Sequence, residues 1–123
     1  MKIKTQNYRA TAGSALTSND VAVVELQGEL DSDSSELFQN TITPLSFGED
    51  RKGGIVLDMS DVGFIDSAGL EQLLSVRDYC NENDCQLRLA GLDETLMKIL
   101  EVTRLENEFE CCAELAEAVK SFA

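Results

Sequence analysis

The sequence predicts an α/β fold with a mixed, mostly parallel sheet of about five strands and about four helices, in the order ββαβαβαβα. Short apolar runs rich in β-branched residues are typical of buried strands. Most of these runs are separated by segments with apolar residues at helical spacing. Such strand–helix–strand units favour parallel pairing through right-handed crossovers, whereas two strands in direct succession at the start predict an antiparallel edge.

The N-terminal part of the chain predicts two strands and a helix. Lys2–Ala12 is weakly apolar and suits an edge strand, whereas Val21–Leu26 is nearly continuous in apolar residues and suits a central one. The polar segment 13–20 between them predicts a turn. We expect a helix from about 33 to 43, because Pro44, the only proline, would stop it.

The central part predicts a strand, a tight loop and a helix, and the rest of the chain is organised around this unit. Ile55–Leu57 indicates a buried strand that ends at Asp58. From Leu70 onward, apolar residues fall on one helical face. Asp66 is a suitable N-cap, because its carboxylate can accept from the free amides of the first turn. Ser67 would then occupy the first helical position, with its side chain directed towards solvent.

The C-terminal part predicts two further strands and two further helices. The central helix is expected to end near 81–84, where Asn and Asp accumulate. Gln86–Ala90 alternates and predicts a strand, and Leu92–Thr103 has the spacing of a helix. A short strand at Phe109–Cys111 and an amphipathic helix over 113–122 complete the expected order.

Length and composition limit the classes of function. A chain of 123 residues predicts one domain, spanning 1–123. The net charge of −13, from 23 acidic and 10 basic residues, opposes direct nucleic-acid binding and favours basic or apolar protein partners, unless it serves only solubility. No apolar run approaches the ~18 residues of a membrane span. The start of the chain has no secretory signal, so we expect a cytoplasmic protein without membrane insertion.

Four cysteines, Cys80, Cys85, Cys111 and Cys112, raise the question of redox or metal chemistry. Cys80 and Cys85 are too widely spaced for a C-x-x-C redox pair. Adjacent cysteines such as Cys111 and Cys112 rarely bridge, because the small ring is strained. With no His, a zinc site is not favoured. We expect four reduced thiols, no metal and no cofactor.

Three enzyme hypotheses find little support in the motifs. A nucleophilic Ser67 would need a base, but the chain has no His, and the local sequence lacks the G-x-S-x-G pattern. A phosphate-binding P-loop motif is also missing. Asp31, Asp58, Asp61 and Asp66 could hold a divalent cation if they converged, although carboxylates at strand ends more often cap helices or form turns. The sequence therefore predicts no catalytic residue and no metal site.

Two motifs carry a resemblance to a known family. Leu26–Asp31 reads LQGELD at the end of a predicted strand, and Phe64–Leu70 reads FIDSAGL at the start of the predicted central helix. In these motifs, and in element order from about Lys4 to Phe122, the chain resembles the STAS domain, and more closely the bacterial anti-sigma-factor antagonists. The resemblance implies that Ser67 is phosphorylated by a partner serine kinase that is also the anti-sigma factor. It implies a phosphoprotein of transcription regulation whose unphosphorylated form binds that kinase and so releases a sigma factor.

The resemblance also implies a partner-binding surface, made by Asp31, Asp66, Ser67, Ala68 and Gly69. From the sequence itself, Asp31 suits a cap for the first helix, and Asp66 suits a cap with or without a further role in shaping the loop. Gly69 either permits close helix–sheet packing or is merely tolerated near a helix start. Ala68 stands where some relatives have a second Ser, which leaves one hydroxyl in this loop. The segment 43–54 is longer than in compact relatives.

Two other functions remain open at this point. The first is a non-switching STAS subunit of a lipid-transport or stress-signalling assembly, in which Ser67 is never modified. The second is a small enzyme or nucleotide-binding protein that uses the acidic cluster. The sequence predicts no oligomeric state.

Overall fold

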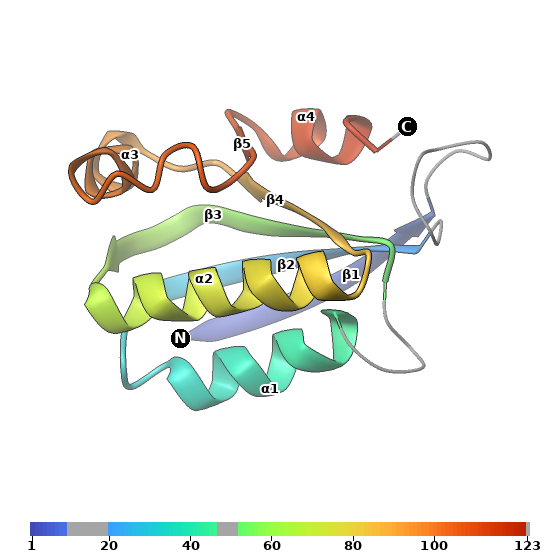
Figure 1. The fold of residues 1–123 in the computed structure, drawn as a ribbon, viewed down its shortest axis with the longest axis horizontal. Coiled ribbons are helices and arrows are strands. Elements are labelled where there is room, and N and C mark those ends of the chain that lie inside the picture. Colours follow the sequence, from blue (N-terminus) through green and yellow to red (C-terminus); the bar gives the residue numbers. More distant parts are fainter. Residues whose placement is uncertain (10–19, 47–51, 123) are drawn as a thin grey trace.

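The computed structural model describes residues 1–9, 20–46 and 52–122, and at its centre lies a five-stranded sheet (Figure 1). The strands are β1 Lys2–Arg9, β2 Asp20–Leu30, β3 Gly54–Ile65, β4 Gln86–Ala90 and β5 Cys111–Cys112. The helices are α1 Ser35–Ser46, α2 Ser67–Glu82, α3 Glu94–Val102 and α4 Leu115–Lys120. The predicted α/β class and the order ββαβαβαβα are confirmed.

The sheet is mixed, as predicted, and its strands lie side by side in the order of the sequence. β1 runs antiparallel to β2, whereas β2, β3, β4 and β5 are parallel to one another. Leu30, at the end of β2, pairs with Ile65, at the end of β3. Because parallel strands end at the same edge of a sheet, the turn after β2 and the start of α2 become neighbours.

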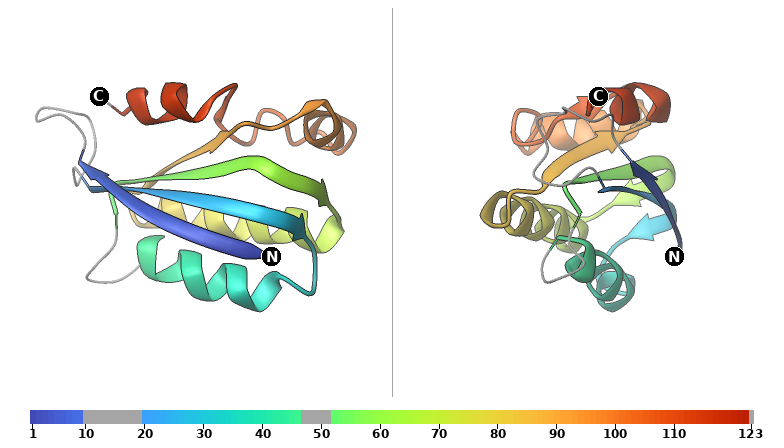
Figure 2. Two further views of the ribbon diagram at one scale, coloured as in Figure 1. Left: turned by 180° about the vertical axis from the view of Figure 1, so that it is seen from behind. Right: turned by 90° about the vertical axis from the view of Figure 1, so that its right-hand side faces the viewer.

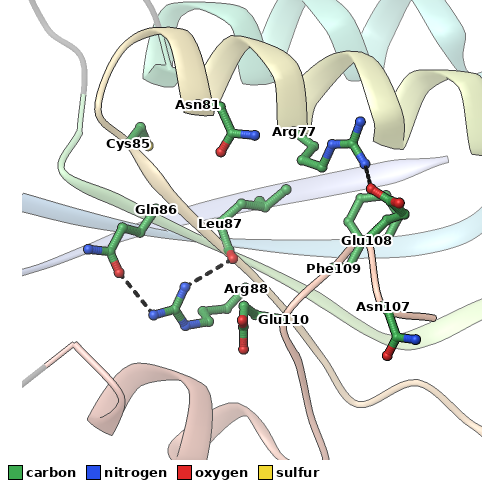
Figure 3. A pocket seen from close by; sticks show the side chains of 10 residues that line it. All are labelled: Arg77, Asn81, Cys85, Gln86, Leu87, Arg88, Asn107, Glu108, Phe109 and Glu110. Carbon is green, nitrogen blue, oxygen red and sulfur yellow. Dashed lines mark hydrogen bonds and ion pairs between the residues drawn. The ribbon is translucent and has the colours of Figure 1, made fainter. Parts of the chain in front are cut away.

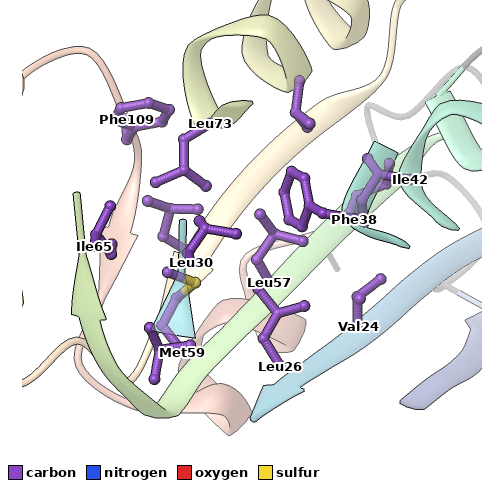
Figure 4. Close-up of a cluster of buried hydrophobic side chains, with 14 of the residues drawn as sticks. Val24, Leu26, Leu30, Phe38, Ile42, Leu57, Met59, Ile65, Leu73 and Phe109 are labelled. Carbon is purple, nitrogen blue, oxygen red and sulfur yellow. The ribbon is translucent and has the colours of Figure 1, made fainter. Parts of the chain in front are cut away.

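Apolar side chains pack on both faces of the sheet. α1 and α2 cover one face, and α4 lies on the other (Figures 1 and 2). The larger cluster includes Phe38, Leu57 and Leu73, whose side chains meet between sheet and helices (Figure 4). The smaller cluster joins Val56 to Phe122. Burial on both faces explains why the central strands have nearly continuous apolar sequences.

Strand β3 is longer than the sequence indicated. The predicted end at Asp58 is wrong, because the strand continues to Ile65 and buries Met59, Val62 and Ile65 along the way. Register shifts between β2 and β3 absorb the irregular spacing of these buried residues. Pairing with a neighbouring strand therefore overrides the local polar sequence, and it carries the chain directly to the start of α2.

Helix α1 also differs from its predicted bounds, because it continues past Pro44 to Ser46. The proline removes one hydrogen bond donor but does not end the helix at Thr43. Ser46 is fully buried, and its hydroxyl donates to the carbonyl of Ile42 at 3.4 Å. The amide of Lys52 donates to the carbonyl of Leu45 at 2.7 Å. These tertiary and capping contacts outweigh the local effect of the ring.

The remaining elements lie within a few residues of their predicted bounds. Residues 10–12 of the predicted edge strand and 13–19 of the predicted turn lie outside the described residues, as do 47–51 of the predicted loop. Within the described ranges, none of the helices combines the length and the apolar character that crossing a membrane requires.

Candidate protein-binding site around Ser67

The start of α2 has the geometry that the sequence predicted. Asp66 is extended, with φ −96° and ψ −172°, and acts as the N-cap. Its carboxylate oxygen Oδ1 accepts from the amide of Gly69 at 2.9 Å, and its carbonyl accepts from the amide of Leu70 at 2.9 Å. Ser67 is the first helical residue and is exposed. Its hydroxyl therefore stands at the positive end of the helix dipole, open to solvent.

Gly69 allows α2 to approach the end of β2 closely. A Cβ atom at this position would lie 2.1 Å from the carbonyl oxygen of Leu30 and 2.9 Å from Cγ2 of Ile65. Neither contact is compatible with a real side chain, and the nearer one involves backbone. Of the two roles that the sequence left open for Gly69, close packing is therefore the correct one.

Asp31 forms the turn between β2 and α1. Its Oδ1 accepts from the amide of Ser34 at 3.1 Å, and the Ser34 hydroxyl oxygen accepts from the amide of Asp31 at 3.0 Å. This reciprocal arrangement resembles a capping box. Ser34 is buried, whereas Asp31 is half-buried. The expected capping role of Asp31 thus takes the form of a turn just before the helix.

A side chain from α2 ties this turn to the helix. Gln72 is only 5% exposed, and its Nε2 donates to the carbonyl of Asp31 at 2.9 Å. The amide of Asp66 also donates to the carbonyl of Leu30 at 3.3 Å. The structure thus brings Asp31 and the segment 66–69 together at one edge of the sheet. Sequence reasoning missed Gln72, because a polar residue in an amphipathic helix is ordinarily assigned to the solvent side.

Asp58 and Asp61, the other two aspartates considered for a cation site, lie elsewhere along β3. Asp58 accepts through Oδ1 from the hydroxyl of Ser60 at 2.7 Å, and Asp61 is exposed opposite Gln27. Among the described residues, no three His, Cys, Asp or Glu side chains are grouped as a metal site requires. The four aspartates considered as a cation site therefore do not converge.

An apolar hollow lies at the same end of the sheet and was not foreseen. It has a volume of about 470 Å³ and lies between the end of β3 and α3. Phe64, two residues before Asp66, is 48% exposed at its wall, and Val102 of α3 is 68% exposed. The signal in the sequence was the adjacent pair Phe64 and Ile65, because neighbouring strand residues point to opposite faces. The lining residues are Phe64, Glu94, Thr95, Lys98, Ile99 and Val102.

Comparisons with known proteins agree with this architecture. The chain is 26% identical over 84 residues to an anti-sigma-B factor antagonist from Staphylococcus aureus, which covers 68% of this chain and 76% of that protein. Its fold is similar to an anti-sigma factor antagonist from Mycobacterium paratuberculosis, with a TM-score of 0.69 at 22% identity, over 98% of this chain and 94% of that one. It is also similar to the Bacillus cell fate determinant SpoIIAA in its phosphorylated form, with a TM-score of 0.67 at 19% identity. This match covers 98% of this chain and 100% of that one. The family model described as "STAS domain" matches residues 14–118. The chain therefore belongs to the STAS domain family.

Proposed function

We propose that this protein is an anti-sigma factor antagonist whose state is set by phosphorylation of Ser67. The unphosphorylated form binds an anti-sigma factor serine kinase and thereby releases a sigma factor, and the protein has no catalysis of its own. The observation that carries the proposal is the exposed Ser67 at the first position of α2. The name of the Staphylococcus aureus relative and the phosphorylated state of SpoIIAA support it.

The position of Ser67 suits a phosphoryl group that changes binding without unfolding the domain. Phosphorylation adds about −1.5 to −2 charges at neutral pH. The first amides of a helix have no intrahelical acceptors, and the helix dipole favours an anion there by about 0.3–1 kcal/mol. Asp66 adds a neighbouring negative charge, which offsets part of this gain. The net effect on folding is therefore small.

Phosphorylation of Ser67 has a larger effect on the binding of a partner than on folding. Two like charges about 4 Å apart repel by about 4 kcal/mol at an effective dielectric constant of about 20. A hundredfold loss of affinity requires only about 2.8 kcal/mol. One carboxylate of the partner placed near Ser67, or simple steric exclusion by the phosphoryl group, is enough to end binding.

The proposed partner-binding surface comprises Asp31, Asp66, Ser67, Ala68 and Gly69. Asp31 and Asp66 offer partly exposed carboxylates on either side of the β2–β3 edge. Gly69 is buried and contributes by setting the position of the loop. With a net charge of −13, the chain suits a partner with a basic docking surface.

Phosphorylation of the purified protein by its cognate anti-sigma factor kinase and ATP tests the proposal. Mass spectrometry with fragmentation should place one phosphoryl group on Ser67, and Ser67→Ala should abolish it. Ser75→Ala is a matched control, because Ser75 is another exposed serine of the same helix. Phosphate on a different residue contradicts the proposal. An unmodified Ser67 in protein from native cells, with Ser67→Ala and Ser67→Asp both functional, would favour the non-switching subunit instead.

A further inference from the structure

The C-terminal end of α2 brings two cysteines together. The helix ends at Glu82, and Asp84 adopts a left-handed conformation with φ 55°. The amide of Cys85 then donates to the carbonyl of Cys80 at 2.9 Å. This hydrogen bond spans six residues, as in the Schellman motif that ends many helices. In that motif the side chains of the donor and acceptor residues frequently make an apolar contact. Here both of those side chains are thiols.

The distance between the two backbones suits a disulfide. With a donor–acceptor distance of 2.9 Å, standard bond lengths limit the two Cα atoms to a separation of at most about 6.8 Å. Disulfides span Cα separations of about 4.4–6.8 Å. The Cys85 thiol donates a hydrogen bond to the Cys80 sulfur, and this bond lowers the pKa of Cys80. The two thiols are therefore neighbours, and this contact favours the thiolate form of Cys80 against the opposing effect of its burial.

A polar cavity gives access to this pair from solvent. Its volume is about 270 Å³, and it lies between α2, β4 and the segment before β5 (Figure 3). Cys85 lines it beside Asn81 and Arg77, although Cys85 is only 3% exposed to bulk solvent and Cys80 only 1%. Arg77 is paired with Glu108 across the cavity. A cavity of this size and polarity admits water and small polar oxidants.

We propose that Cys80 and Cys85 form a reversible disulfide when hydrogen peroxide reaches Cys85 through this cavity. The Cys85 sulfur attacks one peroxide oxygen as its thiol proton passes along the hydrogen bond to the Cys80 thiolate, the O–O bond breaks, and the leaving oxygen departs as water after protonation. Cys80 then attacks the sulfur of the resulting sulfenic acid, the S–O bond breaks, and a second water leaves with the last thiol proton. Two thiols are oxidised to one disulfide, and hydrogen peroxide is reduced to two waters. Cys80 and Cys85 are separated by four residues and so do not form a C-x-x-C motif. At a helix C-terminus, this longer spacing is nevertheless compatible with a redox pair.

The other two cysteines provide a control within the same chain. Cys111 packs against the larger core cluster and Cys112 against the smaller one, so their side chains point to opposite faces of β5. They are not arranged to bridge each other without movement of the backbone. Burial is the largest cause that raises the pKa of both thiols, which disfavours their reactive thiolate form.

Peptide mapping of the full chain tests the proposal, because trypsin separates the two pairs. Cleavage at arginine and lysine gives peptide 78–88 with Cys80 and Cys85, and peptide 105–120 with Cys111 and Cys112. The reduced protein is treated with hydrogen peroxide, and the remaining thiols are alkylated with iodoacetamide before digestion. Peptide 78–88 should lose two hydrogens and escape alkylation, and dithiothreitol should reverse this change. Peptide 105–120 should remain alkylated at both cysteines.

Variants separate this inference from a general sensitivity to oxidation. Cys111→Ser combined with Cys112→Ser should leave oxidation of peptide 78–88 unchanged, whereas Cys80→Ser should abolish its loss of two hydrogens. The proposal is overturned if peptide 78–88 stays alkylated at both cysteines after treatment of the folded wild-type chain. It is also overturned if that peptide oxidises no faster in the folded chain than in the chain unfolded in urea.

Discussion

Three neighbouring residues at the start of α2 have distinct physical roles. Asp66 caps the helix, Ser67 presents a hydroxyl to solvent, and Gly69 lets the helix approach the carbonyl of Leu30. The cap and the exposed position of Ser67 were predictable, because they depend on local sequence. The need for glycine at position 69 was not, because the obstructing atoms belong to β2 and β3.

The role of Gly69 predicts a large effect of one methyl group. Gly69→Ala should lower the free energy of unfolding by about 2–3 kcal/mol, because the helix must move away from Leu30 to make room. Gly63→Ala is the control, since a Cβ atom there meets nothing within 4 Å. Urea denaturation measures both variants. Equal stability of the two would show that the helix accommodates a side chain at position 69.

Loss of the Asp66 N-cap should lower the free energy of unfolding by less than Gly69→Ala does. Asp66→Ala removes the acceptor for the amide of Gly69 and should cost about 1 kcal/mol of folding free energy. Asp66→Asn retains an oxygen acceptor and should recover most of that loss. Thermal or urea unfolding distinguishes the two variants, and an Asp66→Ala protein as stable as the wild type would mean that the cap contributes little.

At the scale of elements, α2 connects the proposed phosphorylation site to the turn after β2. Periodicity was enough to predict the order of strands and helices, because each element repeats its pattern over several residues. It failed where a neighbouring element decides the outcome. Pairing with β2 extends β3 to Ile65, packing carries α1 beyond Pro44, and the C-terminal cap of α2 joins Cys80 to Cys85.

The hydrogen bond between Gln72 and the carbonyl of Asp31 predicts coupling between the two halves of the site. Gln72→Ala should reduce stability by about 1–3 kcal/mol, because a buried hydrogen bond and its packing are lost. It should also weaken partner binding, because the Asp31 turn loses its tie to α2. Glu71→Ala, at an exposed neighbouring position, should change neither quantity. Loss of stability without loss of binding would restrict Gln72 to a structural role.

At the scale of the whole molecule, the proposed site lies where the parallel strands β2 and β3 end, on a chain of net charge −13. This end of the sheet is where α/β folds commonly place binding sites, so the location proposed for the site agrees with the predicted topology. The apolar hollow beside Phe64 could not be predicted from the topology, because it depends on where α3 packs relative to β3.

The net charge predicts how the association rate depends on salt. If the partner presents a basic surface, the association rate constant should fall steeply as ionic strength rises, while the dissociation rate constant changes little. Stopped-flow or surface-based kinetics at several salt concentrations measure both constants. An association rate that is independent of salt would contradict electrostatic attraction between the two proteins.

The most direct measurement compares the affinity of the anti-sigma factor kinase for the unphosphorylated protein and for the protein phosphorylated at Ser67. Calorimetric titration should give an affinity loss of about a hundredfold or more, equivalent to about 2.8 kcal/mol. Thermal unfolding of the two forms should be nearly the same, because the phosphoryl group lies at an exposed helix start. Equal affinities of the two forms, or unfolding of the phosphorylated domain, would contradict the account.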